Sequence, residues 1–217
     1  MRVKFFLVPF FLLLFLAFSC KKVEKASYPN GKLKHEYRYN NSGKMEGEAT
    51  FWYENGNLML TAFYSDGKLD GLLVRYREDG SVISEDKYRD GKLNGISLEK
   101  NRQNAVLSEK TYVNDTLDGP CKTYDDAGHL LSEGQYSHGW FEGKWTYYDQ
   151  FGKIIGEGVF EKGAGMMRSV DVDGNIVGTT EIRNNVKNGK EVYYSIDGKQ
   201  VRTVYYLDGE PVPYEVK

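Results

Sequence analysis

The chain has 217 residues, a formal net charge of −2 at pH 7, two cysteines and 14% aromatic side chains. This weakly acidic balance argues against binding to nucleic acid or to anionic lipid, because clustered Lys and Arg hold those partners. Two cysteines also exclude a fold held together by several disulfides.

The first nineteen residues have the composition of an export signal. Arg2 and Lys4 precede an apolar run from Phe5 to Phe18, which ends at Ser19 and Cys20. A charged start, a short apolar segment and a small residue before the cut are typical of a cleaved secretory signal. The run is short for a bilayer span, although a transmembrane anchor stays open as the alternative.

The end of this run resembles the lipobox of bacterial lipoproteins, in which the cysteine is diacylated and becomes the mature N-terminus. Ser19 and Cys20 fit the pattern, whereas Ala17 and Phe18 depart from it. The resemblance implies that Cys20 carries a lipid. It also implies a cell-envelope location, most readily the bacterial outer membrane, because no Asp follows the cysteine.

Residues 20–27 are polar and are expected to form a tether between the lipid and residues 28–217, a single repeat domain. Removing residues 1–19 takes away Arg2 and Lys4, so that 27 of the 29 basic side chains face 31 acidic ones. The formal charge of the mature chain is then about −4.

Glycines recur every 24 residues through most of the chain, at positions 47, 71, 95, 119 and 143, and then, after a step of 22, at 165 and 189. A fixed period of this length indicates a repeat architecture, in which each unit buries its apolar face against its neighbours. The sequence therefore predicts one elongated domain of about seven repeats.

Each repeat has the signals of a β-hairpin. Short runs end in Asn30–Gly31, Asn55–Gly56, Asp79–Gly80, Asp173–Gly174 or Asp197–Gly198, and Asn104 takes the glycine position in one repeat. Such pairs are typical of two-residue type I′ turns. We expect an all-β fold, an elongated antiparallel β-meander of about fourteen or fifteen strands in a single curled or coiled sheet.

Counting outward from these turns places a large side chain opposite each recurring glycine. The predicted pairs are Gly47–Tyr64, Gly71–Tyr88, Gly95–Tyr112, Gly119–Tyr136, Gly143–Phe160, Gly165–Ile182 and Gly189–Tyr206. We interpret these pairs as rings that cover exposed strand backbone, a device known as aromatic rescue. The recurring glycines then serve the fold and not an active site.

A row of glutamates recurs five residues after the turns, at Glu36, Glu85, Glu109, Glu133 and Glu157. It is either a cation-binding stripe or a solvated row that pairs with neighbours such as Lys122. Equivalent positions lie ~9.6 Å apart, too far to share one metal ion, and this spacing favours the second interpretation.

The repeats resemble the MORN-repeat variant. Tyr53, Gly56 and Leu58 match one half of the family signature, and Tyr64, Gly67, Lys68, Leu69 and Gly71 match the other. The chain also resembles the YwqK-family antitoxins, bacterial proteins built from such repeats. The resemblance implies an extended meander that binds or scaffolds, with membrane association or protein contacts as its role.

No pattern of catalytic or metal-binding residues was found. His35, His129 and His138 fall at different positions of the repeat, and no nucleophile motif or phosphate-binding loop is present. We therefore expect a protein that is not an enzyme and has no cofactor and no metal site.

Departures from the repeat suggest where a partner binds. His138 to Gly143 interrupts the usual loop with Trp140 and Phe141, and Trp145 follows, while Met166 and Met167 stand one repeat on. Exposed Trp and Met are typical of interface anchors. The alternative is structural: Phe141 fills the position that Leu occupies elsewhere, and Trp140 covers a neighbouring hairpin.

We therefore expect a lipid-anchored extracytoplasmic scaffold that binds a protein or an envelope component. An antitoxin-like protein that neutralises a toxin is the first alternative, and the apolar run counts against it because a cytoplasmic antitoxin needs no export signal. Glycan binding by the aromatic rows is the second.

Overall fold

The computed structural model describes residues 22–213, which form 17 β-strands. Within this range no residue is helical, so it contains no helix of the length and hydrophobicity that crossing a membrane requires. The strands are β1 (Val23–Ser27), β2 (Leu33–Arg38), β3 (Gly47–Trp52), β4 (Leu58–Ser65), β5 (Lys68–Tyr76), β6 (Val82–Arg89), β7 (Lys92–Lys100), β8 (Val106–Val113), β9 (Thr116–Tyr124), β10 (Leu130–Ser137), β11 (Trp140–Tyr148), β12 (Ile154–Glu161), β13 (Ala164–Val170), β14 (Ile176–Arg183), β15 (Val186–Tyr194), β16 (Gln200–Leu207) and β17 (Glu210–Val212).

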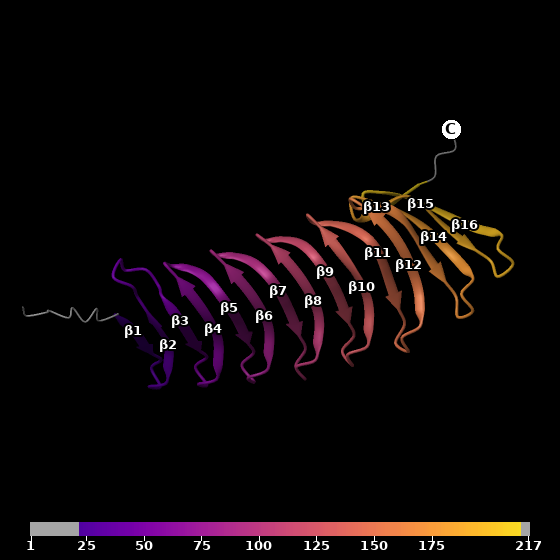
Figure 1. The fold of residues 1–217 in the computed structure, drawn as a ribbon. Helices are drawn as coiled ribbons and strands as arrows, with labels where there is room; N and C mark the ends of the chain where they lie inside the picture. The colour runs from indigo at the N-terminus through magenta and orange to yellow at the C-terminus, as the bar shows by residue number, and fades with distance from the viewer. Residues whose placement is uncertain (1–21, 214–217) are drawn as a thin grey trace, which may run out of the picture.

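Each strand pairs antiparallel with the next one in the sequence, and together they form one open sheet (Figure 1). The predicted all-β meander is confirmed. Strands are more numerous than expected, because Val23–Ser27 pairs with β2 and the short β17 pairs with β16. Most of the segment expected as a tether, residues 20–27, is therefore strand.

The turns on one edge of the sheet, which we call the long-turn edge, are not type I′. In the turn Tyr53–Asn57, the N–H of Gly56 donates to the carbonyl of Tyr53, and the N–H of Tyr53 donates to the carbonyl of Asn57. Only Gly56 has a positive φ, of 90°. This is a type I turn closed by a bulge, which needs one left-handed residue where type I′ needs two. The pairing consequently slips by one residue beside the turn, where Trp52 lies opposite Leu58.

Seven two-residue turns with both φ angles positive lie on the opposite edge, the short-turn edge. They are Asp66–Gly67, Asp90–Gly91, Asn114–Asp115, His138–Gly139, Lys162–Gly163, Asn184–Asn185 and Asp208–Gly209. The type I′ geometry is therefore present in every repeat from Asp66 onward. It occurs in the turns that join one predicted hairpin to the next, for which the sequence analysis predicted no turn type.

All seven predicted pairs between a glycine and a large side chain are confirmed. At Gly71 the need for glycine has a physical reason other than aromatic rescue. Gly71 has a φ of 137° and lies in a bulge where residues 70–72 of β5 face Phe63 alone. A Cβ atom on Gly71 would stand 2.8 Å from the Cβ of Phe63, not against the ring of Tyr88. Glycine is thus required at position 71 by the backbone conformation and by the close preceding strand.

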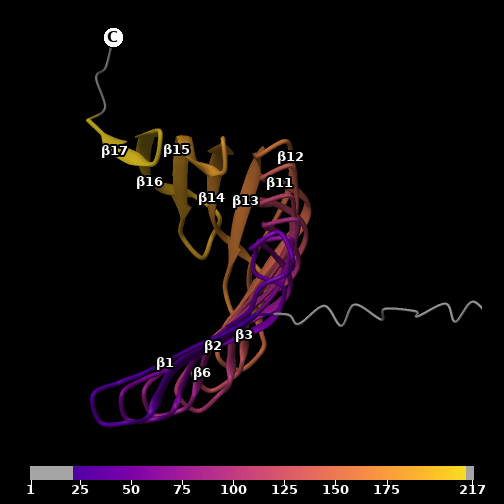
Figure 2. The same ribbon diagram turned by 90° about the vertical axis from the view of Figure 1, so that its left-hand side faces the viewer.

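The 22-residue step corresponds to the loss of this bulge. Strands β12 and β13 pair without a register shift, whereas β4 with β5, β6 with β7, β8 with β9, β10 with β11 and β14 with β15 each contain one. A bulge bends a strand and increases its twist. Viewed along the sheet, the strands follow an arc, and the strands from β13 onward are turned across its end (Figure 2).

One face of the sheet holds most of the buried side chains, and we call it the packed face. Its buried residues are Ala49, Ala62, Leu73, Ser84, Asp86, Ser108, Cys121, Ser132, Trp145, Phe160, Thr180 and Glu191. The other side, the open face, carries the glutamate row. Among the described residues, Cys121, Trp145 and Phe160 form the buried apolar cluster, and Tyr136, Phe141, Tyr147, Met167 and Ile182 pack around it.

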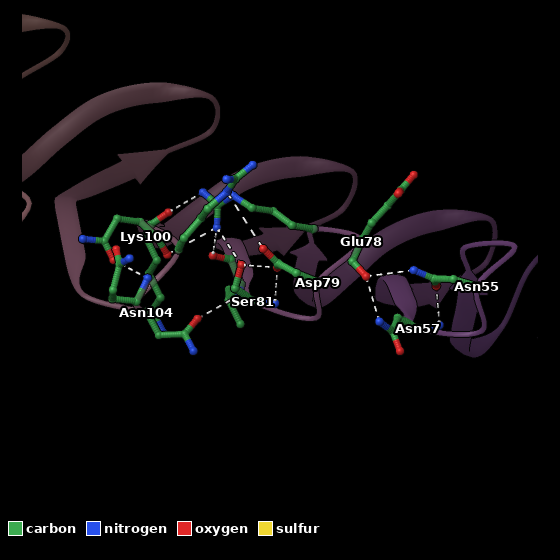
Figure 3. Close-up of polar contacts among 12 residues, drawn as sticks. Asn55, Asn57, Glu78, Asp79, Ser81, Lys100 and Asn104 are labelled. Atoms are coloured by element: carbon green, nitrogen blue, oxygen red, sulfur yellow. Dashed lines mark hydrogen bonds and ion pairs between the residues drawn. The ribbon is translucent and has the colours of Figure 1, made fainter.

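Side chains tie successive turns of the long-turn edge to one another. The side-chain amides of Asn55 and Asn57 both donate to the carbonyl of Glu78 in the next turn, at 2.9 and 2.7 Å (Figure 3). One repeat on, Arg77 donates to the carbonyl of Lys100 at 2.7 Å, and Asn104 accepts the N–H of Val82 at 2.9 Å. These bonds join neighbouring hairpins beyond the strand pairing itself.

Candidate interaction surface

The five residues expected to bind a partner are divided between the core and the surface. Trp145 is buried, with only 4% of its surface exposed. Its indole ring lies over Gly134, where an added Cβ would come within 2.2 Å of the ring, and its Nε1 donates to the carbonyl of Gln135 at 3.1 Å. Trp145 therefore belongs to the fold, because a glycine on the adjacent strand leaves room for it.

Phe141 and Met167 also pack in this cluster. The ring centroid of Phe141 lies 4.5 Å from that of Trp145, 5.3 Å from Tyr136 and 5.6 Å from Phe160. Phe141 pairs with Tyr136 as Leu69 pairs with Tyr64, so it fills the leucine position of the repeat. Burial in this cluster raises the pKa of Tyr136 to about 12.

Trp140 is 40% exposed and is held from the hairpins that follow it. Its ring lies 2.7 Å from where a Cβ on Gly163 would stand. The side chain of Asn185 accepts the N–H of Phe141 and donates to the carbonyl of Gly139, both at 2.8 Å. Trp140 thus covers a neighbouring hairpin, as the structural alternative expects, and still presents part of its ring to solvent.

Met166 lies on the open face beside a residue that the sequence analysis missed. Met166 pairs across strands with Val159, and the two are 42% and 70% exposed. With Lys144, Glu157 and Arg168 they line a hollow of about 310 Å³. We call these five residues the β12–β13 patch. Val159 could have been found by counting outward from the two-residue turn Lys162–Gly163, because it stands directly opposite Met166.

Charged side chains border this patch. Lys144 Nζ lies 2.9 Å from Glu157, and its hydrogen bond lowers the pKa of that carboxyl. Arg168 lies opposite Glu157 on the neighbouring strand. The patch thus combines an apolar centre with a charged rim, the arrangement usual in protein interfaces.

Four members of the glutamate row, Glu36, Glu85, Glu133 and Glu157, form ion pairs with lysines. Lys25 contacts Glu36 at 2.9 Å, Lys122 contacts Glu133 at 3.9 Å, and Lys100 pairs with Glu85. The interpretation of a solvated, paired row is the one that these contacts support. Residues 22–213 contain no group of three or more His, Cys, Asp or Glu side chains placed to hold a metal ion.

The three histidines lie in separate places. His35 stacks on Tyr37 with ring centroids 5.1 Å apart, His129 contacts Asp125 at 2.9 Å, and His138 contacts Ser137 at 3.0 Å. Each has its own local partner, so they do not form one site.

Comparison with known proteins identifies the repeat. The profile of the MORN repeat variant matches residues 22–41, 45–66, 117–138 and 141–162. The search of curated proteins found no match. The last matched segment begins one residue after Trp140 and contains the cluster residues Phe141, Trp145, Tyr147 and Phe160 of β11 and β12. Between and beyond the matched segments, the hairpins have the same strand pairing, so the fold continues where the sequence match does not.

Proposed function

We propose that this protein is a lipid-anchored, extracytoplasmic scaffold that binds another protein through the open face of its sheet and catalyses no reaction. The observation that carries the proposal is the β12–β13 patch, where Val159 and Met166 are exposed side by side. Repeats of this variant generally serve as protein- or membrane-binding modules.

The patch has the physical properties of a binding anchor. Apolar side chains that are exposed in the free protein stabilise a complex when a partner removes them from water. Met adapts to the shape of a partner, and the charged rim of Lys144 and Arg168 adds specificity. We expect the partner to present an apolar group bordered by acidic side chains.

Attachment to a membrane is supported by the sequence alone. The apolar run from Phe5 to Phe18, Ser19 and Cys20 lie outside the described residues. The test is Cys20→Ser, followed by cell fractionation and intact-mass measurement. We expect loss of the lipid mass and release from the membrane, and unchanged processing with unchanged membrane retention would contradict the anchor.

Partner binding is tested by capture from crosslinked cell envelopes with Val159→Ser/Met166→Ser. A control is Phe63→Ser/Leu72→Ser, which removes two apolar side chains, 46% and 45% exposed, from the open face of earlier strands. We expect the first variant to lose a captured protein that the control retains, at an unchanged melting temperature. Equal capture by both variants would contradict the assignment of the patch.

Trp140→Ala separates the remaining candidate from the patch. Because its ring packs on Gly163, we expect a small loss of stability. Capture that falls without any change in melting temperature would add Trp140 to the binding surface, and capture that falls only in step with stability would leave it a structural residue.

A further inference from the structure

Three apolar side chains protrude from neighbouring turns of the long-turn edge. Phe151 is 84% exposed, Val172 67% and Ile196 87%. Their turns, Asp149–Lys153, Asp171–Asn175 and Ser195–Lys199, connect β11 to β12, β13 to β14 and β15 to β16. The three turns follow one another along the lower edge of the sheet at its C-terminal end (Figure 1).

Four earlier turns of the same edge, from Tyr53–Asn57 to Asp125–His129, have charged tips. The residue at the position of Val172 and Ile196 is Glu54, Glu78, Arg102 or Asp126, and each of these is exposed. Backbone geometry is the same in both sets, since each turn is closed by the same two hydrogen bonds. The fold therefore does not require an apolar tip, and the apolar residues need another explanation.

More apolar surface lies at the base of these tips. Ile154, Ile155, Ile176 and Val201 are all exposed where the strands begin. The apolar character thus extends from the protruding side chains to the first residues of β12, β14 and β16.

The charges of these turns do not attract anionic surfaces. Asp149, Asp171, Asp173 and Asp197 outnumber Lys153 and Lys199. Hydrogen bonds within the turns lower the pKa of the Asp171 carboxyl, and a hydrogen bond from Lys199 lowers that of Asp197. Both are therefore ionised at neutral pH.

We propose that Phe151, Val172 and Ile196 insert together into the surface of an uncharged lipid bilayer. Successive turns are separated by two strands, or ~9.6 Å, so a protein would need three pockets at that spacing to receive them. A bilayer accommodates protruding apolar side chains at any spacing, and its interface gains from their burial. Without a basic cluster, the contact depends on apolar burial and not on anionic headgroups.

The contact also suits a chain expected to be attached to a membrane by Cys20, because attachment would keep a bilayer within reach. It does not depend on the β12–β13 patch, which lies on strands and not at these turns. Failure of one proposal would therefore leave the other standing.

Site-specific labelling tests the insertion. In the full chain carrying Cys20→Ser, Ile196→Cys is labelled with an environment-sensitive fluorophore, while Cys121 is buried and stays unlabelled. The matched control is Glu78→Cys, at the same position of an earlier turn. With phosphatidylcholine vesicles we expect the label at position 196 to brighten and shift to the blue, in 0.5 M as in 0.1 M salt, while the label at 78 stays unchanged.

The triple change Phe151→Ser/Val172→Ser/Ile196→Ser should weaken binding to these vesicles ~10-fold or more relative to Glu54→Ser/Glu78→Ser/Arg102→Ser. Equal responses at positions 196 and 78, or binding that needs anionic lipid and is lost in salt, would overturn the proposal. A response at position 196 that grows with protein concentration without vesicles would show self-association instead, and would also overturn it.

Discussion

The first and the last long turns of the sheet have one backbone geometry and two ways of holding it. In the first set, Tyr28 and Tyr53 reach across to the next hairpin, where their hydroxyls donate to the carbonyls of Trp52 and Tyr76 at 2.8 and 2.7 Å. In the later set, Asp149 and Asp171 stand at the same position and accept backbone N–H groups of their own turns at 2.9 Å. At this position the side chain fastens an early turn to its neighbour and a late turn to itself, while Lys153 separately donates to the carbonyl of Val172 in the next late turn.

The packed face shows the same division. Between β5 and β7, Asp86 accepts hydrogen bonds from Arg75, Ser84 and Ser97, at 2.5, 2.9 and 2.6 Å. Between β10 and β13 the corresponding surface is the aromatic cluster around Trp145. Repeats of one fold can therefore be stabilised by polar networks or by ring packing, provided that each hairpin contacts its neighbours.

The largest expected effect in this comparison is that of Trp145→Ala. The change empties the space over Gly134 and should lower the free energy of unfolding by ~3–5 kcal/mol, as measured by urea denaturation. Because each hairpin contacts only its neighbours, amide exchange should accelerate in β10–β13 and stay unchanged in β2–β5. Trp140→Ala is the matched control, with a loss of about 1 kcal/mol or less. Uniform acceleration across the sheet would contradict the local division.

A smaller effect is expected from Tyr53→Phe, which removes one hydroxyl bond between turns. We expect a loss of ~1 kcal/mol and faster amide exchange at Arg77–Ser81, the turn that the hydroxyl fastens. Asp149→Ala is the counterpart in the later set, and it should loosen residues 149–153 most, with a smaller effect on residues 171–175 through the hydrogen bond from Lys153 to Val172. Amide exchange measured by NMR checks both variants, and acceleration at 149–153 that is no greater than at 171–175 in the Asp149 variant would contradict the role of Asp149 within its own turn.

The smallest effect at neutral pH is expected from Tyr136→Phe, which becomes informative in alkali. The folded pKa of Tyr136 is about 12, raised from 10 by burial. The stability that this group contributes is therefore complete below pH 10 and falls as the pH rises through 12, since the unfolded chain loses its proton first. Urea midpoints at pH 9 and pH 11 should differ less in Tyr136→Phe than in the unmodified protein. Equal differences would place Tyr136 outside the buried cluster.

Much of this fold could be predicted from the glycine period, because pairing along a strand is set by simple counting. Every pair between a glycine and a large side chain was found in this way. The turn type on the long-turn edge was predicted wrongly, because an Asn–Gly or Asp–Gly pair fits both a type I′ turn and a type I turn with a bulge. The bulge at Gly71 was missed for a related reason: it changes pairing with the preceding strand only, while counting followed the next one.

The candidate surface was harder to predict than the fold. Trp145 looked exposed because its burial depends on Gly134, a glycine outside the 24-residue period, on the adjacent strand. The exposure of Val159 was not predicted, because the sequence alone does not show whether a single valine in a strand is buried or exposed. Its exposure follows from the partner position of Met166 and from the absence of any second layer over the open face within the described residues.

The bulge that is missing between β12 and β13 suggests how proteins of this kind change shape during evolution. The loss of two residues there alters the path of the sheet and leaves the pairing of hydrophobic side chains intact on either side. Gene duplication can therefore set the length of such a sheet, while two-residue deletions set its contour. Lineages could reshape a binding surface by small in-frame deletions, without a new core having to be selected.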